Sequence, residues 1–123
     1  MKTKIEIILG FLESGKTSFI NSMLRNDELQ NETIVIVQNE FGQTEIKNEF
    51  LNSAKNTRVI NIMNESNEEI NEAYIKKIIT QYSPERIFIE MNGMKDSTPV
   101  VNLFNTKNIK KLCKIEDIVA VID

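Results

Sequence analysis

The sequence predicts an α/β fold with three layers and a mostly parallel sheet. Five short runs rich in Ile and Val recur along the chain, and they are nearly continuous rather than alternating with polar residues. Such runs are typical of strands that are covered on both faces. Helical patterns lie between the runs, and regular alternation of strands and helices favours parallel pairing. The predicted strands are Lys4–Leu9, Thr33–Gln38, Arg58–Ile62, Arg86–Glu90 and Asp117–Asp123.

Four amphipathic helices are predicted between these strands, the first of them beginning near Lys16. Ser66 and Glu69 have capping-box spacing at the start of the third helix. Pro99 suits the first turn of the fourth. The helices are expected to bury, in order, Phe19, Ile20, Met23 and Leu24; Ile46, Phe50, Leu51 and Ala54; Ile70, Tyr74, Ile78 and Ile79; and Val100, Leu103 and Phe104.

Length and composition indicate one globular domain and exclude several classes of function. The chain has 123 residues and a net charge of −3, so it lacks the basic excess that nucleic-acid binding requires. It has one cysteine and no histidine, which excludes an internal disulfide and leaves oxygen atoms or one thiolate to bind a metal. No apolar run approaches the length of a membrane span. We therefore expect a cytoplasmic protein with neither a nucleic acid nor a membrane as partner.

Two features near the C-terminal end favour structural roles. Lys107, Lys110, Lys111 and Lys114 form a basic cluster, which is more typical of a solvated face than of an anion site. Cys113 lies among these lysines and next to Leu112, and we expect it to be a small core residue.

The string G-F-L-E-S-G-K-T, which runs from Gly10 to Thr17, matches the pattern G-x-x-x-x-G-K-[ST] in full. It follows a predicted strand and opens a predicted helix, so backbone N–H groups can converge there on a phosphate. Lys16 is expected to reach the β- and γ-phosphates, and the Thr17 hydroxyl to bind Mg²⁺. The motif predicts a P-loop NTPase fold. The predicted nucleotide-binding residues of this segment are Gly10, Glu13, Ser14, Gly15, Lys16, Thr17 and Ser18.

A second string, I-F-I-E-M-N-G, places an acidic residue at the end of an apolar strand. Glu90 has the position of a Walker B carboxylate, which lies beside Mg²⁺ and the attacking water. Gly93 follows three residues later and can present its N–H group to a γ-phosphate. We predict that Glu90 is catalytic and binds the metal, and that Gly93 contacts the nucleotide.

A third string, Q-N-E-F-G, follows the second predicted strand directly. Ligands of open α/β sheets bind at the carboxyl ends of the strands, so Asn39 and Glu40 are expected to face the same crevice as Lys16. Glu40 is predicted to hold Mg²⁺ through a water or to orient the nucleophile. Lys16, Glu40 and Glu90 are thus the predicted catalytic residues, and Thr17, Glu40 and Glu90 the predicted metal ligands.

Together, these strings resemble the CobW-like GTPases, relatives of the nickel-insertion GTPases UreG and HypB. The family reads roughly G-F-L-G-x-G-K-T, then N-E-F-G, then an apolar strand ending E-x-x-G, and later P-V. The corresponding strings here also include D-S-T-P-V at 96–100, so the resemblance spans nearly the whole chain. It implies a GTPase that uses GTP and Mg²⁺ and is linked to a metal or a metal-containing cofactor, in the manner of a metallochaperone.

The sequence departs from the family pattern in several places, including the neighbourhoods of Gln43 and Lys47 after the N-E-F-G string. The family's C-x-C-C stretch is replaced by V-I-N-I-M-N-E-S, from Val59 to Ser66, which contains no cysteine. Glu13 replaces a loop glycine and is expected to point outward, because a carboxylate would repel the phosphates. No N-K-x-D string for guanine recognition precedes Asp123. We therefore expect residues 1–123 to be the N-terminal part of a P-loop GTPase domain that is truncated before its guanine-recognition loop.

The sequence predicts a GTP-binding and GTP-hydrolysing module whose client is a metalloprotein or a metal cofactor. Two alternatives stay open: a small-metabolite P-loop kinase, and a non-catalytic regulatory module gated by nucleotide. The kinase would need a lid that carries arginines, and the chain has only Arg25, Arg58 and Arg86. A homodimer is also left open.

Overall fold

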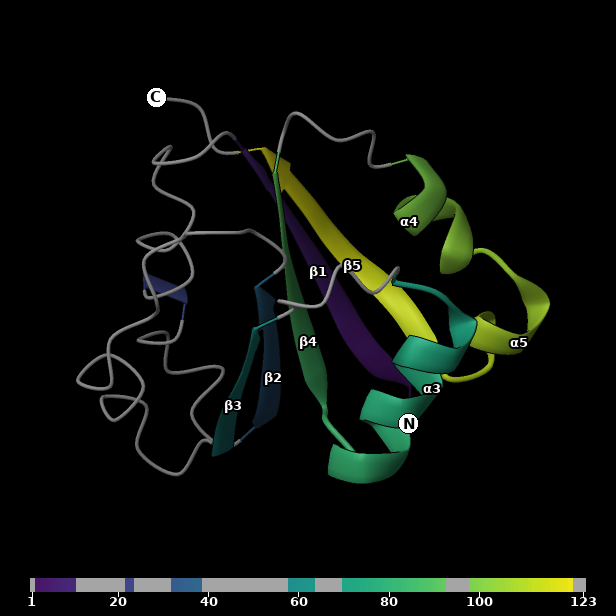
Figure 1. Ribbon diagram of the computed structural model, residues 1–123, viewed down its shortest axis with the longest axis horizontal. Helices are drawn as coiled ribbons and strands as arrows, with labels where there is room; N and C mark the ends of the chain where they lie inside the picture. The colour runs from purple at the N-terminus through teal and green to yellow at the C-terminus, as the bar shows by residue number, and fades with distance from the viewer. Residues whose placement is uncertain are drawn as a thin grey trace.

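The computed structural model describes residues 2–10, 22–23, 32–38, 58–63, 70–92 and 98–120. Its strands form one sheet, and the helices of the described part lie against that sheet (Figure 1). The first two predicted helices fall almost wholly outside the described residues. The elements are β1 (Thr3–Gly10), β2 (Thr33–Gln38), β3 (Arg58–Met63), α3 (Glu72–Tyr82), β4 (Arg86–Asn92), α4 (Thr98–Leu103), α5 (Lys107–Lys110) and β5 (Cys113–Ala120).

The five strands form a single sheet in the order β3-β2-β4-β1-β5. All four strand pairs are parallel, as the alternation of strands and helices predicted. The predicted α/β fold is therefore confirmed. None of the described helices is long and apolar enough to cross a membrane.

One face of the sheet packs against α3, α4 and α5, which lie together on one side of it (Figure 1). Alternate strand residues such as Ile7, Val35 and Ile89 point to this face and are fully buried. Each buried aliphatic side chain stabilises the fold by about 1.5–3 kcal/mol. The helices contribute the predicted core residues Ile78, Val100, Leu103 and Phe104, and the core also includes Cys113 as predicted.

The opposite face of the sheet is buried as well, which explains why the strands are apolar at nearly every position. Ile8, Ile34, Ile36 and Phe88 point to this face and are 0% exposed. Three charged residues share the face with them, and their side chains are also buried: Glu6, Arg86 and Glu90.

Helix α3 begins later than the predicted capping box. Its N-cap is Asn71, whose side-chain oxygen accepts a hydrogen bond from the backbone N–H of Tyr74 at 2.9 Å. The predicted cap at Ser66 is wrong, because Asn71 satisfies the first turn instead. Ser83 ends the helix in a left-handed conformation, with φ of 46°, and Pro84 cannot continue the helix.

Four strands have bounds different from the predicted ones. β1 is longer by one residue at each end, and β3 is longer by one residue at its C-terminal end. β4 runs to Asn92 rather than stopping at Glu90, because Met91 is buried in the core and Asn92 pairs with Gly10 of β1. β5 is Cys113–Ala120, so the predicted start at Asp117 is too late. A bulge between Ile115 and Asp117 shifts the pairing with β1 and interrupts the apolar pattern that a sequence reading needs.

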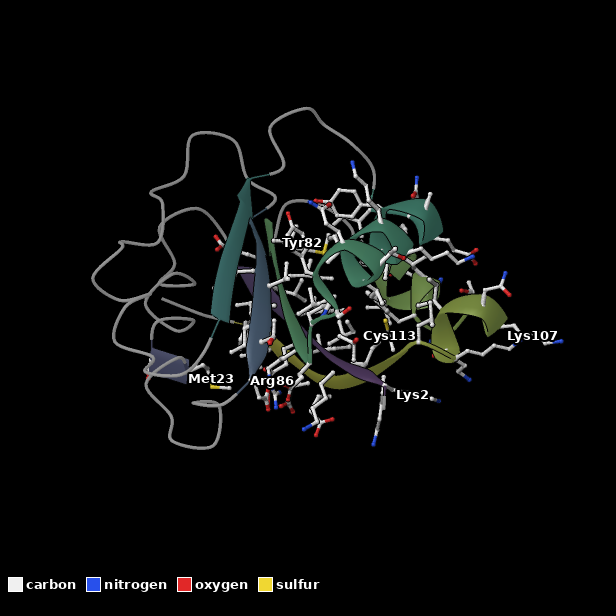
Figure 2. The ribbon with its side chains drawn as sticks, turned by 90° about the horizontal axis from the view of Figure 1, so that it is seen from below. Lys2, Met23, Tyr82, Arg86, Lys107 and Cys113 are labelled. Carbon is white, nitrogen blue, oxygen red and sulfur yellow. The ribbon has the colours of Figure 1, made fainter. Side chains whose placement is uncertain are left out.

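A cluster of ionic side chains joins the amino-terminal ends of three strands. The guanidinium of Arg86 donates to both carboxylate oxygens of Glu32, at 2.7 and 3.2 Å, and to Glu6 at 3.0 Å. Figure 2 shows Arg86 on the side of the sheet away from α3. Lys4 lies at the margin of the cluster, with its Nζ 4.0 Å from Glu32. The guanidinium thus offsets the cost of burying the Glu6 carboxylate.

Replacing Arg86 by Met should lower the free energy of unfolding by about 3–5 kcal/mol, because it leaves the Glu6 carboxylate buried without its cation. Adding Glu6→Gln to that variant should recover a large part of the loss. The control is Lys4→Met, since the Lys4 side chain is 44% exposed and its pair should contribute about 1 kcal/mol or less. Urea unfolding measures all of these values, and equal losses for Arg86→Met and Lys4→Met would contradict the assignment.

The stability of the protein should also depend on pH through Glu6. Burial raises the pKa of Glu6 above 4.5, although Arg86 acts to lower it. Because the pKa of Glu6 is higher in the folded than in the unfolded state, its protonation contributes to the free energy of unfolding. This contribution is complete below pH 4.5 and is lost as the pH rises through the pKa of the folded state. The wild type should therefore lose stability relative to Glu6→Gln over that interval, as measured by urea unfolding at several pH values. A difference that is constant with pH would exclude this titration.

Candidate nucleotide-binding site

The order of the strands predicts a ligand crevice at the carboxyl ends of β1 and β4. These two strands are neighbours, but the chain continues from them in opposite directions. After β1 it goes to β2, which lies beyond β4, and after β4 it goes to β5, which lies beyond β1. Ligands of open α/β sheets bind where two neighbouring strands diverge in this way. The topology thus selects one edge of the sheet before any motif is considered.

The pairing register brings the three sequence motifs to this edge. Gly10, which opens the G-x-x-x-x-G-K-T string, pairs with Asn92 at the end of β4. Glu90 is level with Ile8 on one side and with Gln38, the last residue of β2, on the other. Gly10, Glu90 and Gln38 therefore lie within two residues of the same level on three neighbouring strands.

Gly10 is a predicted site residue that belongs both to the paired strand β1 and to the P-loop motif. It is the last residue of β1 and the first of the motif, and it stays hydrogen-bonded in register with β4. A glycine has no Cβ, so a bound phosphate can approach the backbone closely there. The pairing of β1 with β4 thus fixes the position along the sheet at which the P-loop motif begins.

Glu90 lies on β4 with its side chain 0% exposed. It points to the face away from α3, α4 and α5, the face that also holds Arg86. A fully buried carboxylate costs several kcal/mol unless positive charge or hydrogen-bond donors surround it. Carboxylate oxygens are the ligands that Mg²⁺ prefers, so the chemistry of Glu90 fits the predicted metal. Because β4 continues to Asn92, Glu90 is held inside the strand rather than at its last position.

Most of the predicted site residues lie outside the part of the chain that the structure describes. Their assignments stay predictions from the sequence. Gly93 directly follows Asn92, and Glu40 is two residues beyond Gln38. The residues concerned are Glu13, Ser14, Gly15, Lys16, Thr17, Ser18, Glu40 and Gly93.

The register places Asn92, to which sequence analysis assigned no role, next to the predicted site residue Gly10. The backbone of Asn92 pairs with Gly10, so it borders the start of the phosphate-binding string. The signal that could have revealed it is Met91, an apolar residue that extends the strand beyond Glu90. Pairing with β1 decides the end of β4, and pairing is not visible in a single strand.

Cys113 lies at the opposite end of the sheet from this crevice. It pairs with Thr3 at the start of β1, about 23 Å from Gly10 at the rise of an extended strand. Its side chain is 2% exposed, and burial raises the pKa of its thiol to about 11. Within the described residues, no three Asp, Glu, Cys or His side chains gather as a metal site.

Comparison with known proteins matches residues 4–123 to the nucleotide-binding domain of the CobW/HypB/UreG family. Two curated relatives are both named zinc chaperone CobW. The protein from Pseudomonas aeruginosa is 27% identical over 135 residues, which cover 99% of this chain and 36% of that protein. The protein from a Sinorhizobium species is 25% identical over 132 residues, with coverage of 99% and 37%. The chain thus spans little more than a third of the length of these relatives.

Two crystal structures share the fold. The zinc-bound YjiA GTPase from E. coli superimposes with a TM-score of 0.56 at 18% identity, over 98% of this chain and 40% of that one. A zinc-bound triple mutant of the YjiA GTPase gives a TM-score of 0.60 at 17% identity, over 100% and 41%. Both confirm the predicted P-loop fold. Because the family model matches residues 4–123, the chain belongs to the CobW/HypB/UreG family.

Proposed function

We propose that this chain binds and hydrolyses GTP with the help of Mg²⁺. The observation that carries the proposal is the register that sets Gly10 beside Asn92 and Glu90 level with Ile8, at the point where β1 and β4 diverge. Membership of a nucleotide-binding family supports it, and so does the likeness to a GTPase of the same fold. The choice of GTP over ATP rests on that likeness, because the chain contains no N-K-x-D string.

In the proposed reaction, water attacks the γ-phosphate in line with the leaving oxygen. Lys16 and the backbone N–H groups around Gly15 stabilise the charge that develops on the phosphate oxygens. Thr17, Glu40 and Glu90 would hold Mg²⁺, which neutralises phosphate charge when it is bound. Glu40 and Glu90 also orient the water. Gly93 donates its N–H group to the γ-phosphate, so the segment after β4 can respond to hydrolysis.

The proposed biological setting is the handling of a metal or a metal-containing cofactor for a metalloprotein client in the cytoplasm. The name of the two CobW relatives, zinc chaperone, supports a link to metal handling. This chain lacks the cysteines that the family pattern places between the N-E-F-G string and the acidic strand. We therefore propose that its capacity to bind a soft metal is altered or absent, while the nucleotide-binding machinery is retained.

Replacing Lys16 by Ala should weaken GTP·Mg²⁺ binding by about tenfold to a hundredfold, the worth of a hydrogen bond to a charged group. Calorimetric titration measures the affinity, and circular dichroism checks the fold. The control is Lys76→Ala, because Lys76 is exposed on α3 and far along the chain from the P-loop. If a folded Lys16→Ala protein bound GTP·Mg²⁺ as tightly as the wild type, the phosphate-binding assignment would be wrong.

Replacing Glu90 by Gln should slow GTP hydrolysis by about a hundredfold or more, while changing GTP affinity far less. The amide keeps the shape of the buried side chain but removes the charge that orients metal and water. Phosphate release and nucleotide titration separate the two effects. The matched control is Glu85→Gln, an exposed residue just before β4. Equal losses of affinity and turnover would make Glu90 a structural residue. Undetectable turnover in the wild type would favour the non-catalytic regulator.

Titration with Co²⁺ should give no intense thiolate charge-transfer band. One cysteine and no histidine cannot supply the three or four soft ligands of a tight zinc or cobalt site. The raised pKa of Cys113, about 11, also disfavours the thiolate. A control titration of the Cys113→Ser variant identifies any weak signal from this thiol. A strong band at one metal per chain that is lost in Cys113→Ser would show a site shared between two copies.

A further inference from the structure

A group of exposed lysines surrounds the amino-terminal ends of β1 and β5. We call this group the lysine patch and define it as Lys2, Lys107, Lys110, Lys111 and Lys114. The backbone N–H of Thr3 donates to the carbonyl of Leu112 at 2.8 Å, which joins the segment of Lys2 to the turn after α5. Figure 2 shows the side chains of Lys2 and Lys107 extending outward from this region.

The framework of the lysine patch is well anchored. Ile109 of α5 is 0% exposed and Cys113 at the start of β5 is 2% exposed, so the backbone on both sides of Lys110 and Lys111 is held by the core. The N–H of Leu112 closes the turn onto the carbonyl of Ile109 at 2.8 Å. Leu112 itself is 36% exposed and adds an accessible apolar side chain next to Lys111. The backbone that carries Lys110 and Lys111 is therefore held in place while their side chains stay exposed.

Within the described residues, no carboxylate pairs with these five ammonium groups. The sequence from Ser97 to Ile115 contains four lysines and no acidic residue, in a chain whose net charge is −3. Lysines on α3 differ, because Glu72 precedes Lys76 by four residues and can balance it across one helical turn. Gathering like charges without partners costs about 0.5 kcal/mol for each close pair in water. Folding does not require such a patch, whereas an anionic partner would be attracted to it.

Exposed acidic residues border the lysine patch and limit the size of that partner. Glu116 and Asp117 come two and three residues after Lys114 on β5, and both are exposed. Glu85 is exposed next to the start of β1, where its carbonyl accepts from the N–H of Lys4 at 2.9 Å. A duplex nucleic acid or a membrane would bring its phosphates within a Debye length, about 8 Å, of these carboxylates. A short acidic segment of a protein would contact the lysines alone.

We propose that the lysine patch is a docking surface for an acidic segment of a partner protein. The patch lies at the opposite end of β1 from Gly10, about 23 Å away at the rise of an extended strand, so a docked partner leaves the nucleotide crevice open. Lysine side chains at a rim speed association with an oppositely charged partner more than they lengthen its lifetime. The expected complex is therefore transient and sensitive to salt. The proposal does not depend on GTP hydrolysis.

A fluorescein-labelled hexaglutamate peptide tests the proposal by fluorescence anisotropy. Lys110→Glu/Lys111→Glu should weaken its binding by about tenfold, since two attractions become repulsions. Lys110→Gln/Lys111→Gln should give an intermediate loss of affinity for the peptide. This milder variant tests the same lysines if the charge-reversal variant fails to fold. The matched control, Lys76→Glu/Lys77→Glu on α3, makes the same change in net charge at two exposed positions and should change the affinity less than about twofold.

Equal weakening by the two charge reversals would overturn the proposal, because it would show attraction to net charge alone. Tighter binding to phosphatidylserine vesicles or to duplex DNA than to the peptide, through the same lysines, would overturn it too, since the partner would then be a lipid surface or a nucleic acid. Lys16→Ala should bind the peptide like the wild type. Failure of the GTPase assignment is thus distinguishable from failure of the docking surface.

Discussion

The parallel pairing of β1 with β4 is the constraint on which both the site and the charged core depend. Seven residue pairs, from Lys4 with Arg86 to Gly10 with Asn92, hold the two central strands in one register. A slip by one residue would turn every side chain of one strand to the other face. Glu90 would then enter the apolar core beneath the helices, and Arg86 would lose Glu6. The register of β1 with β4 therefore specifies both the packing of the apolar core and the position at which the predicted phosphate-binding loop begins.

One face of the sheet forms the apolar core, and the other face holds the buried charged residues, including the one proposed to bind the metal. The strand residues that pack under α3, α4 and α5 are apolar, and the helices add mainly aliphatic side chains to them. Glu6, Arg86 and Glu90 all point the other way, where they are buried among Ile8, Phe88 and similar residues. Burying charge is tolerated there because Arg86 supplies the compensation at one end of the sheet. Glu90 faces the proposed metal site at the other end. A fully apolar sheet would fold more easily but could not hold a cation.

Local sequence predicts the middle of each strand better than its ends. Ile and Val runs identified all five strands, because a strand that is covered on both faces must be apolar almost throughout. The end of β4 at Asn92 and the start of β5 at Cys113 depend on pairing with β1, which is a tertiary property.

The helices and the site residue show the same limit. Asn71 replaced Ser66 as the cap of α3 because several polar residues near the helix start can all cap it. Helix α5 was missed because four residues are too few to show a period. Glu90 could be predicted from its place after an apolar run, whereas its complete burial could not.

The proposed nucleotide crevice and the lysine patch lie at opposite ends of the sheet, yet one stretch of chain connects them. The segment that leaves β4 after Asn92 forms α4 and α5 before it enters β5. Leu103 at the end of α4, Phe104 just after it and Ile109 in α5 belong to the same buried cluster as Ile89 and Met91 of β4. A partner that shifts α5 would therefore disturb the buried cluster to which the strand carrying Glu90 also contributes. Any change in nucleotide affinity produced in this way would be matched by an equal change in partner affinity, since coupling between two binding sites is reciprocal.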